Sequence, residues 1–350
     1  MPKSNVRRLV AQKRLAVTLA LAISLSMAAA CSTHKSVEVE KLLTPLSDAD
    51  TSQLIAQVNR LVTVRSLRGK VDIQFEDTSF ATSGIAEKYH TADGTITLQR
   101  PGKVYLVIQV PLIATDVAQM TSDGEHFRIA ILQGDEKYHR FVRGTNNAVY
   151  SKLDGESAGD PAKKGKADTG AQTVKALSNL RPQHLTDAML IRPIDQQAPG
   201  LLYAQSEFFQ SEKDTNQPLS KKRVMRGYYL LDEFQPGDNG SARLLRRFWF
   251  DRVNGIRLSR LQTFDDRGAL VTDVTYGELK RFGPGGEALL PAQVGLTRPR
   301  DHYKITINYQ APEAVTLDHD YPADAFVLEN KWGLQEVDLD AQKKAGLPKN

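Results

Sequence analysis

From Leu67 onward, apolar and polar residues alternate along most of the chain, which is the pattern of half-buried β-strands. Lys103–Val110 places its apolar side chains on one face, and Tyr303–Tyr309 repeats this arrangement near the end of the chain. Counting all such segments predicts roughly 11 to 13 strands. Because each strand presents one apolar face, we expect them to form one large sheet.

Short connections rich in glycine, proline and asparagine separate these strands. Strands joined by so few residues run antiparallel, and no segment has the pattern of a parallel β-α-β crossover. The sequence therefore predicts an antiparallel meander. Its turn signals are Asp93-Gly94, Pro101-Gly102, Asp123-Gly124, Gly134-Asp135, Pro236–Gly240, Asn254-Gly255 and Gly283–Gly286.

Two stretches depart from the alternation and have helical spacing. Ser47 and Asp48 offer N-cap oxygens to a first helix, whose apolar positions fall between residues 54 and 62. Midway, residues 152–175 contain almost no large apolar side chains and predict a flexible surface loop. Helical segments follow that loop, and Pro182 starts the second of them. We expect these helices to lie across the open side of the sheet as a lid.

The predicted fold class is mainly β with a few helices (α+β): an antiparallel meander forming an open half-barrel with a helical lid. No break in composition divides the chain. We therefore assign one domain to residues 46–335, with the flexible insert inside it, and a C-terminal tail to residues 336–350.

The N-terminal segment, residues 1–30, has the layout of a secretory signal: basic residues, an apolar middle, then small residues. Cys31, the single cysteine, follows directly, so the segment resembles the bacterial lipobox, although Ala28 stands where leucine is usual. The alternatives are an ordinary exported protein with a chance cysteine, or an uncleaved anchor. The residue after Cys31 is Ser32, whereas an aspartate at that position retains enterobacterial lipoproteins in the inner membrane. The resemblance thus implies an acyl anchor in outer-membrane lipid, facing the periplasm, with residues 31–45 as a tether.

Charge and cysteine content exclude several classes of protein. Five of the 46 basic residues lie before Cys31, and the rest of the chain carries 41 basic and 41 acidic residues. A balanced charge removes the main support for a nucleic-acid partner. A single cysteine excludes a disulfide framework within the chain and a zinc-thiolate site.

No motif for catalysis, a cofactor or a metal is present. The seven histidines have no metal-binding helical spacing, and Asp318-His319-Asp320 precedes a proline as a turn would. The chain has no Gly-x-Ser-x-Gly, no phosphate loop and no dinucleotide fingerprint. We therefore expect a protein that is not an enzyme and needs no cofactor.

The apolar face of the sheet either lines a cavity or fills a core. A cavity walled by aliphatic side chains offers water no hydrogen bonds and suits acyl chains, each buried methylene contributing about 0.8 kcal/mol. The alternative is a filled core in a non-catalytic interaction or assembly lipoprotein of the envelope. The candidate cavity residues are Val104, Leu106, Ile108, Tyr303, Ile305 and Ile307.

Several short motifs resemble the lipoprotein-localisation family, the LolA-like periplasmic carriers and LolB-like outer-membrane receptors. The resemblance covers roughly residues 54–309, but Ile113 replaces the family's glycine and the insert is longer. It implies a half-barrel that binds lipoprotein acyl chains or another lipid for delivery to the outer membrane. It also implies that Leu112 and Ile113 form an apolar loop that contacts lipid; alternatively, they tuck into the sheet edge. The motifs are Leu67-Arg68-Gly69-Lys70, Val110-Pro111-Leu112-Ile113, Asp123-Gly124 and Leu290–Thr297 followed by Tyr303–Tyr309.

Basic residues gather on two neighbouring predicted strands. They could bind phospholipid head groups or an acidic partner, or they could simply keep an edge strand soluble. These residues are Lys221, Lys222, Arg223, Arg226, Arg243, Arg246 and Arg247.

Overall fold

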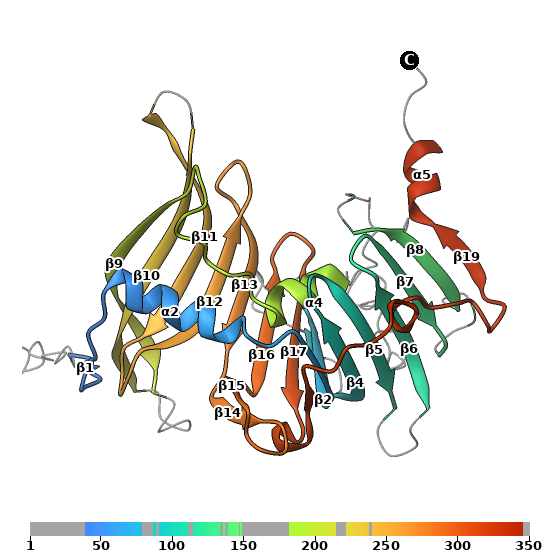
Figure 1. The fold of residues 1–350 in the computed structure, drawn as a ribbon, viewed down its shortest axis with the longest axis horizontal. Coiled ribbons are helices and arrows are strands. Elements are labelled where there is room, and N and C mark those ends of the chain that lie inside the picture. Colours follow the sequence, from blue (N-terminus) through green and yellow to red (C-terminus); the bar gives the residue numbers. More distant parts are fainter. Residues whose placement is uncertain are drawn as a thin grey trace, which may run out of the picture.

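The computed structural model describes residues 39–78, 87–88, 91–110, 115–133, 136, 139–146, 148, 182–214, 222–237 and 240–345. The signal segment, Cys31, most of the tether, the apolar loop at Leu112 and Ile113, and the insert at 152–175 lie outside these residues. In the described part, one large open sheet dominates, with α2 (Thr51–Leu61) and α4 (Pro182–Met189) across one face (Figure 1).

The sheet contains 17 described strands and is not closed into a barrel. Fourteen of them lie side by side, from an edge at β9 to an edge at β19 (Figure 1). In spatial order they are β9 (Leu202–Lys213), β10 (Arg223–Pro236), β11 (Ala242–Asp251), β12 (Arg257–Phe264), β13 (Leu270–Tyr276), β16 (Gln293–Arg298), β17 (Tyr303–Tyr309), β2 (Ser66–Asp77), β4 (Ala92–Gln99), β5 (Lys103–Gln109), β6 (Asp116–Ser122), β7 (His126–Ile131), β8 (Arg140–Thr145) and β19 (Gln335–Asp338).

The antiparallel meander predicted from the turns is confirmed, and its two halves meet where β17 pairs with β2. Only two described pairings are parallel, β19 with β8 and β1 with β10, and neither is a β-α-β crossover in this part of the chain. The predicted strand number was too low because strands of two to four residues carry no periodicity. The short strands in the sheet are β19, β1 (Lys41–Leu42), β3 (Glu87–Lys88) and β18 (Thr316–Leu317), and β14 (Leu279–Phe282) pairs separately with β15 (Ala288–Pro291).

The first predicted helix forms, but its N-cap is Asp50 rather than Ser47 or Asp48. The Asp50 carboxylate accepts a hydrogen bond from the Gln53 amide at 2.8 Å, and the Gln53 side chain accepts one from the Asp50 amide at 2.9 Å. This reciprocal capping box satisfies two N–H groups at the helix start. Asp48 instead binds Arg252, with the oxygen and nitrogen 2.6 Å apart.

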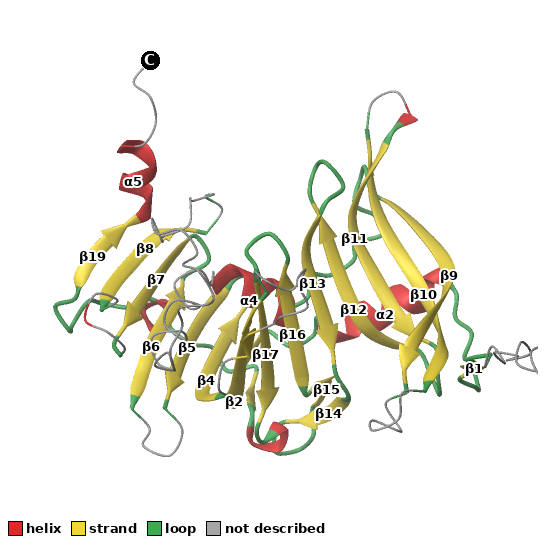
Figure 2. Ribbon diagram, turned by 180° about the vertical axis from the view of Figure 1, so that it is seen from behind, coloured by secondary structure: helices red, strands yellow, loops and turns green. Residues whose placement is uncertain are grey.

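The helical cover predicted for the sheet is confirmed for α2 and α4. Both helices run across the same face, and the strands lie in front of them in the opposite view (Figure 2). We call this the helix-covered face. α4 begins at Pro182, as predicted, because proline fits the first turn, where its missing N–H has no helical partner. Burial of Leu185 and Ala188 on its underside then fixes it against the sheet.

The six candidate cavity residues belong to the packed core. All are at most 2% exposed, and they share one hydrophobic cluster with the buried side chains of α2 and α4. Leu106, for example, is flanked across the sheet by Ile96 and Met120, which are also buried. All six positions are therefore packed against other buried side chains in the described part of the chain.

The end of the described chain continues the sheet beyond the domain boundary placed at residue 335. β19 pairs with β8 over Gln335–Asp338, and α5 (Leu339–Ala345) follows. Leu328, Trp332 and Leu334 pack with Phe141 in a separate small cluster near this edge. The remaining short elements are the 3-10 helices η6 (Pro312–Ala314) and η7 (Ala323–Phe326).

Candidate functional site: a pocket between α4 and the second half of the sheet

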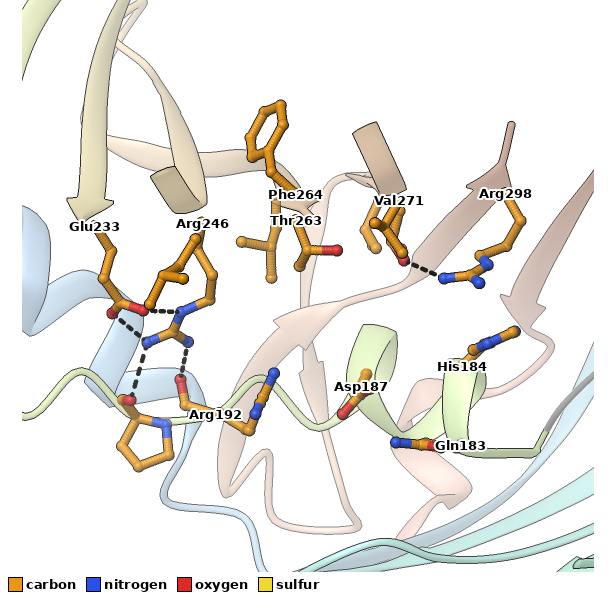
Figure 3. Close-up of a pocket in the computed structure, with 15 residues that line it drawn as sticks. Gln183, His184, Asp187, Arg192, Glu233, Arg246, Thr263, Phe264, Val271 and Arg298 are labelled. Atoms are coloured by element: carbon orange, nitrogen blue, oxygen red, sulfur yellow. Dashed lines mark hydrogen bonds and ion pairs between the residues drawn. The ribbon is translucent and has the colours of Figure 1, made fainter. Parts of the chain in front are cut away.

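A pocket of about 590 Å³ lies on the helix-covered face, between α4 with its following segment and strands β10 to β13 and β16 (Figure 3). Its lining divides into an apolar floor from the sheet and a charged rim contributed by both the sheet and the α4 region. The lining residues are Gln183, His184, Asp187, Arg192, Pro193, Glu233, Leu245, Arg246, Leu261, Thr263, Phe264, Val271, Thr272, Val274 and Arg298.

The floor is apolar because neighbouring strands present apolar side chains to the same face. Leu261 and Val274 are direct partners between β12 and β13 and are buried. Leu245, Phe264 and Val271 are only partly buried, so part of this surface faces the pocket space. Open apolar area in a concave site can accept a hydrophobic group.

One side of the rim is an ion pair. Arg246 donates to both Glu233 oxygens, at 2.9 and 2.6 Å, and both side chains are largely buried. Tyr203 also donates to Glu233, at 2.9 Å. Burial and this hydrogen bond raise the pKa of Tyr203 to about 12, so its hydroxyl remains a donor at physiological pH. Glu233 therefore has few acceptor positions left for a ligand.

The segment after α4 is fastened to the rest of the protein. Arg246 donates to the carbonyls of Arg192 and Pro193, at 3.1 and 3.4 Å. Asn59 of α2 both donates to and accepts from the backbone of Ile194, at 2.9 and 2.8 Å. Arg100 donates to the carbonyls of Leu190 and Ile191, at 3.3 and 3.1 Å, and to that of Val64 at 3.0 Å. These contacts fix the C-terminal end of α4, so this side of the pocket is preformed.

Asp187 projects from α4 into the pocket (Figure 3). Its side chain is exposed to solvent, and the nearby pocket walls desolvate it in part. This desolvation raises the pKa of Asp187 above its usual value, and the positive charges of Arg192 and Arg298 offset part of the rise. Arg298 is itself held by Asp301 at 2.7 Å and by the Thr272 hydroxyl at 2.8 Å.

His184 contacts the buried side chain of Tyr303, a residue of the core. Its Nδ1 lies 2.7 Å from the hydroxyl of Tyr303, and the two rings stack. Among the described residues, no group of three His, Cys, Asp or Glu side chains could hold a metal ion. Within the same part of the chain, no helix is long and apolar enough to span a bilayer.

The basic residues on β10 and β11 do not form an unpaired cationic patch. Arg223 lies 3.5 Å from Glu40, Arg226 lies 2.7 Å from Asp251, and Arg243 pairs with Asp266. The remaining two arginines of the set face acids directly across the ladder, Arg246 opposite Glu233 and Arg247 opposite Asp232. Pairing with acids accounts for these five arginines without the head-group hypothesis, and Lys221 lies outside the described residues.

Sequence reasoning missed the pocket. Its lining combines α4 with strand residues that are 46 to 115 positions further along the chain, and no motif marks them. One signal was available: Gln183, His184 and Asp187 fall at helical spacing that gives α4 a polar face beside its buried one. No sequence signal marked the partly buried floor residues Phe264 and Val271, because they look like ordinary strand positions.

Comparisons with known proteins show a likeness of fold without close relatives. No family model matches the sequence, and no curated protein matches it significantly. A solved structure of a DUF1329 family protein from Desulfovibrio piger is 12% identical, with 81% of this chain and 97% of that chain covered, at a TM-score of 0.39. A LolA superfamily protein from Nitrosomonas europaea is 10% identical, with 80% and 99% covered, at 0.38.

An outer membrane lipoprotein-sorting protein domain from Vibrio parahaemolyticus is 9% identical, with 79% of this chain and 95% of that chain covered, at a TM-score of 0.38. The last two structures carry names from the group that the strand and turn motifs resemble. At this identity and TM-score, the likeness carries no information about ligand or activity.

Proposed function

We propose that the protein is a lipid-anchored envelope protein that binds a hydrophobic moiety, an acyl chain of a lipoprotein or of another lipid, for delivery to the outer membrane. The observation that carries the proposal is the pocket on the helix-covered face, whose apolar floor stays open beside a filled core. It is a binding protein rather than an enzyme.

The size of the pocket sets how the ligand binds. About 590 Å³ lies in the range of small-ligand sites and holds part of a long acyl chain. Burial of about six methylenes contributes roughly 5 kcal/mol. Association costs about as much in lost translational and rotational freedom. Apolar burial alone therefore gives weak binding, and polar contacts at the rim supply the remainder.

Delivery in this scheme is passive. The hydrogen-bonded segment 190–194 keeps one wall of the pocket in place. The ligand can therefore enter a pocket whose wall is already formed. The acyl anchor at Cys31 holds the domain at the periplasmic face of the outer membrane, which fixes where the cargo is released. The alternative, an assembly lipoprotein with a filled core, draws on the complete burial of residues such as Leu106 and Ile305.

A substitution that places a charge on the pocket floor distinguishes lipid binding from the assembly function. We expect Val271→Asp to reduce uptake of a fluorescent fatty acid or phospholipid at least about tenfold, because a carboxylate would face the acyl chain. Leu270→Asp is the matched control: it is the adjacent partly buried residue of β13, outside the pocket lining. Equal uptake by both variants and the wild type would remove the pocket from the proposal.

The anchor has its own test. Metabolic labelling with palmitate in a Gram-negative host should mark the wild-type protein, whereas Cys31→Ala should carry no label and should leave the membrane fraction. Label retained in the variant would place the lipid elsewhere and end the anchor hypothesis.

A further inference from the structure

Among the described residues, two opposite charges in the pocket have no hydrogen-bond or ion-pair partner. Within the described part of the chain, the Asp187 carboxylate and the Arg192 guanidinium make no hydrogen bond or ion pair. They line the same pocket, yet no carboxylate oxygen lies within 4.0 Å of a guanidinium nitrogen. Figure 3 shows Asp187 between Arg192 on one side and Arg298 on the other.

The other charged groups of the rim are engaged. Glu233 is bound by Arg246 and Tyr203, and Arg246 also binds two carbonyls. Arg298 uses Nε for Asp301 and Nη1 for Thr272, which leaves its Nη2 without a described acceptor. The groups available to a ligand are therefore one acceptor, at Asp187, and donors on both sides of it, at Arg192 and Arg298.

Resting on the proposed function, we propose that the pocket selects a zwitterionic phospholipid head group, with a primary ammonium at Asp187 and a phosphate diester at Arg192 and the free edge of Arg298. The acyl chains then lie on the floor formed by Phe264 and Val271. Guanidinium groups match phosphate oxygens in charge and in planar donor geometry.

The Asp187 carboxylate favours a primary ammonium over a quaternary one. A primary ammonium donates N–H groups to a carboxylate in charge-assisted hydrogen bonds. A choline group has no N–H and is recognised by cages of aromatic rings. Among the described residues that line the pocket, Phe264 supplies the single benzenoid ring.

A purely anionic head group fits less well. Phosphatidylglycerol would satisfy the arginines but leave the Asp187 carboxylate near a second negative charge. The pKa of Asp187 is already raised by desolvation, so its ionised form gains from a bound cation. One charge-assisted hydrogen bond gained or lost corresponds to a change in affinity of about tenfold or more.

Isothermal titration calorimetry on the full chain tests this selection. The same amphipathic polymer keeps the protein in solution in every titration. The ligands are the dihexanoyl forms of phosphatidylethanolamine, phosphatidylcholine and phosphatidylglycerol, with dihexanoylglycerol as a ligand that has the chains but no head group. We expect phosphatidylethanolamine to bind roughly tenfold more tightly than the other two phospholipids.

Two variants test which side chain binds the ammonium and which binds the phosphate of the head group. Asp187→Asn should abolish the preference for phosphatidylethanolamine over phosphatidylglycerol. Arg192→Met should lower the affinity for all three phospholipids and leave the affinity for dihexanoylglycerol unchanged. Asp324→Asn, an exposed carboxylate outside the pocket lining, is the control and should behave as wild type.

The outcomes separate this inference from the proposed function. Equal binding of all four ligands, or tightest binding of phosphatidylglycerol or phosphatidylcholine, would overturn the head-group selection and leave an acyl pocket. Absence of binding by every ligand, dihexanoylglycerol included, would overturn the acyl pocket itself.

Discussion

Replacing Arg246 by methionine should lower the free energy of unfolding by about 3 kcal/mol, the usual scale for breaking a buried ion pair by removing one partner. Glu233 would lose two charge-assisted hydrogen bonds while remaining about 4% exposed. The carbonyls of Arg192 and Pro193 would lose their donor as well. Methionine retains apolar packing beside Phe248, over which the guanidinium now lies.

Chemical denaturation of matched variants measures this effect. Arg243→Met is the control on the same strand, because Arg243 pairs with an Asp266 side chain that is 85% exposed. Surface pairs of this kind contribute up to about 1 kcal/mol. If both substitutions changed the unfolding free energy equally, the Arg246–Glu233 pair would not be the fastening that holds the segment after α4.

Replacing Leu106 by alanine should lower the free energy of unfolding by about 3 kcal/mol, within the range of Leu→Ala substitutions in packed cores. Leu106 is fully buried, and its cross-strand neighbours Ile96 and Met120 are fixed by the ladder, so the cavity left behind has little room to collapse. Lipid affinity of the folded variant should stay unchanged, because Leu106 does not line the pocket.

Leu245→Ala is the counterpart on the pocket wall. Since Leu245 is only partly buried, this substitution should cost less than half as much stability while weakening acyl binding. A Leu106→Ala protein that remained as stable as wild type but lost lipid binding would reverse these roles and restore the original cavity hypothesis.

Much of the fold follows from local pattern. The alternation in Lys103–Gln109 and Tyr303–Tyr309, and the turns that separate the strands, predict antiparallel neighbours, because a short connection permits no other arrangement. Pro182 marks the start of α4 for an equally local reason. Asp50 with Gln53 is a capping pattern that the sequence contains, although Ser47 and Asp48 also looked suitable.

What the sequence did not reveal depends on contacts between distant residues. Whether Arg246 is a free cation or half of an ion pair depends on its register against β10, which places it opposite Glu233. Whether an apolar strand residue fills a core or faces a pocket depends on where α4 ends. Leu106 and Val271 are both aliphatic residues of predicted strands, but of the two only Leu106 is completely buried.

The most direct test of the central claim is native mass spectrometry, with lipid extraction, on the protein purified from a Gram-negative envelope. We predict that the wild type and Leu270→Asp retain a co-purified phospholipid or acylated species, and that Val271→Asp, folded by circular dichroism, does not. A wild-type protein that carries no lipid and takes up none when fatty acid or phospholipid is added would contradict the account and favour an assembly protein with a filled core.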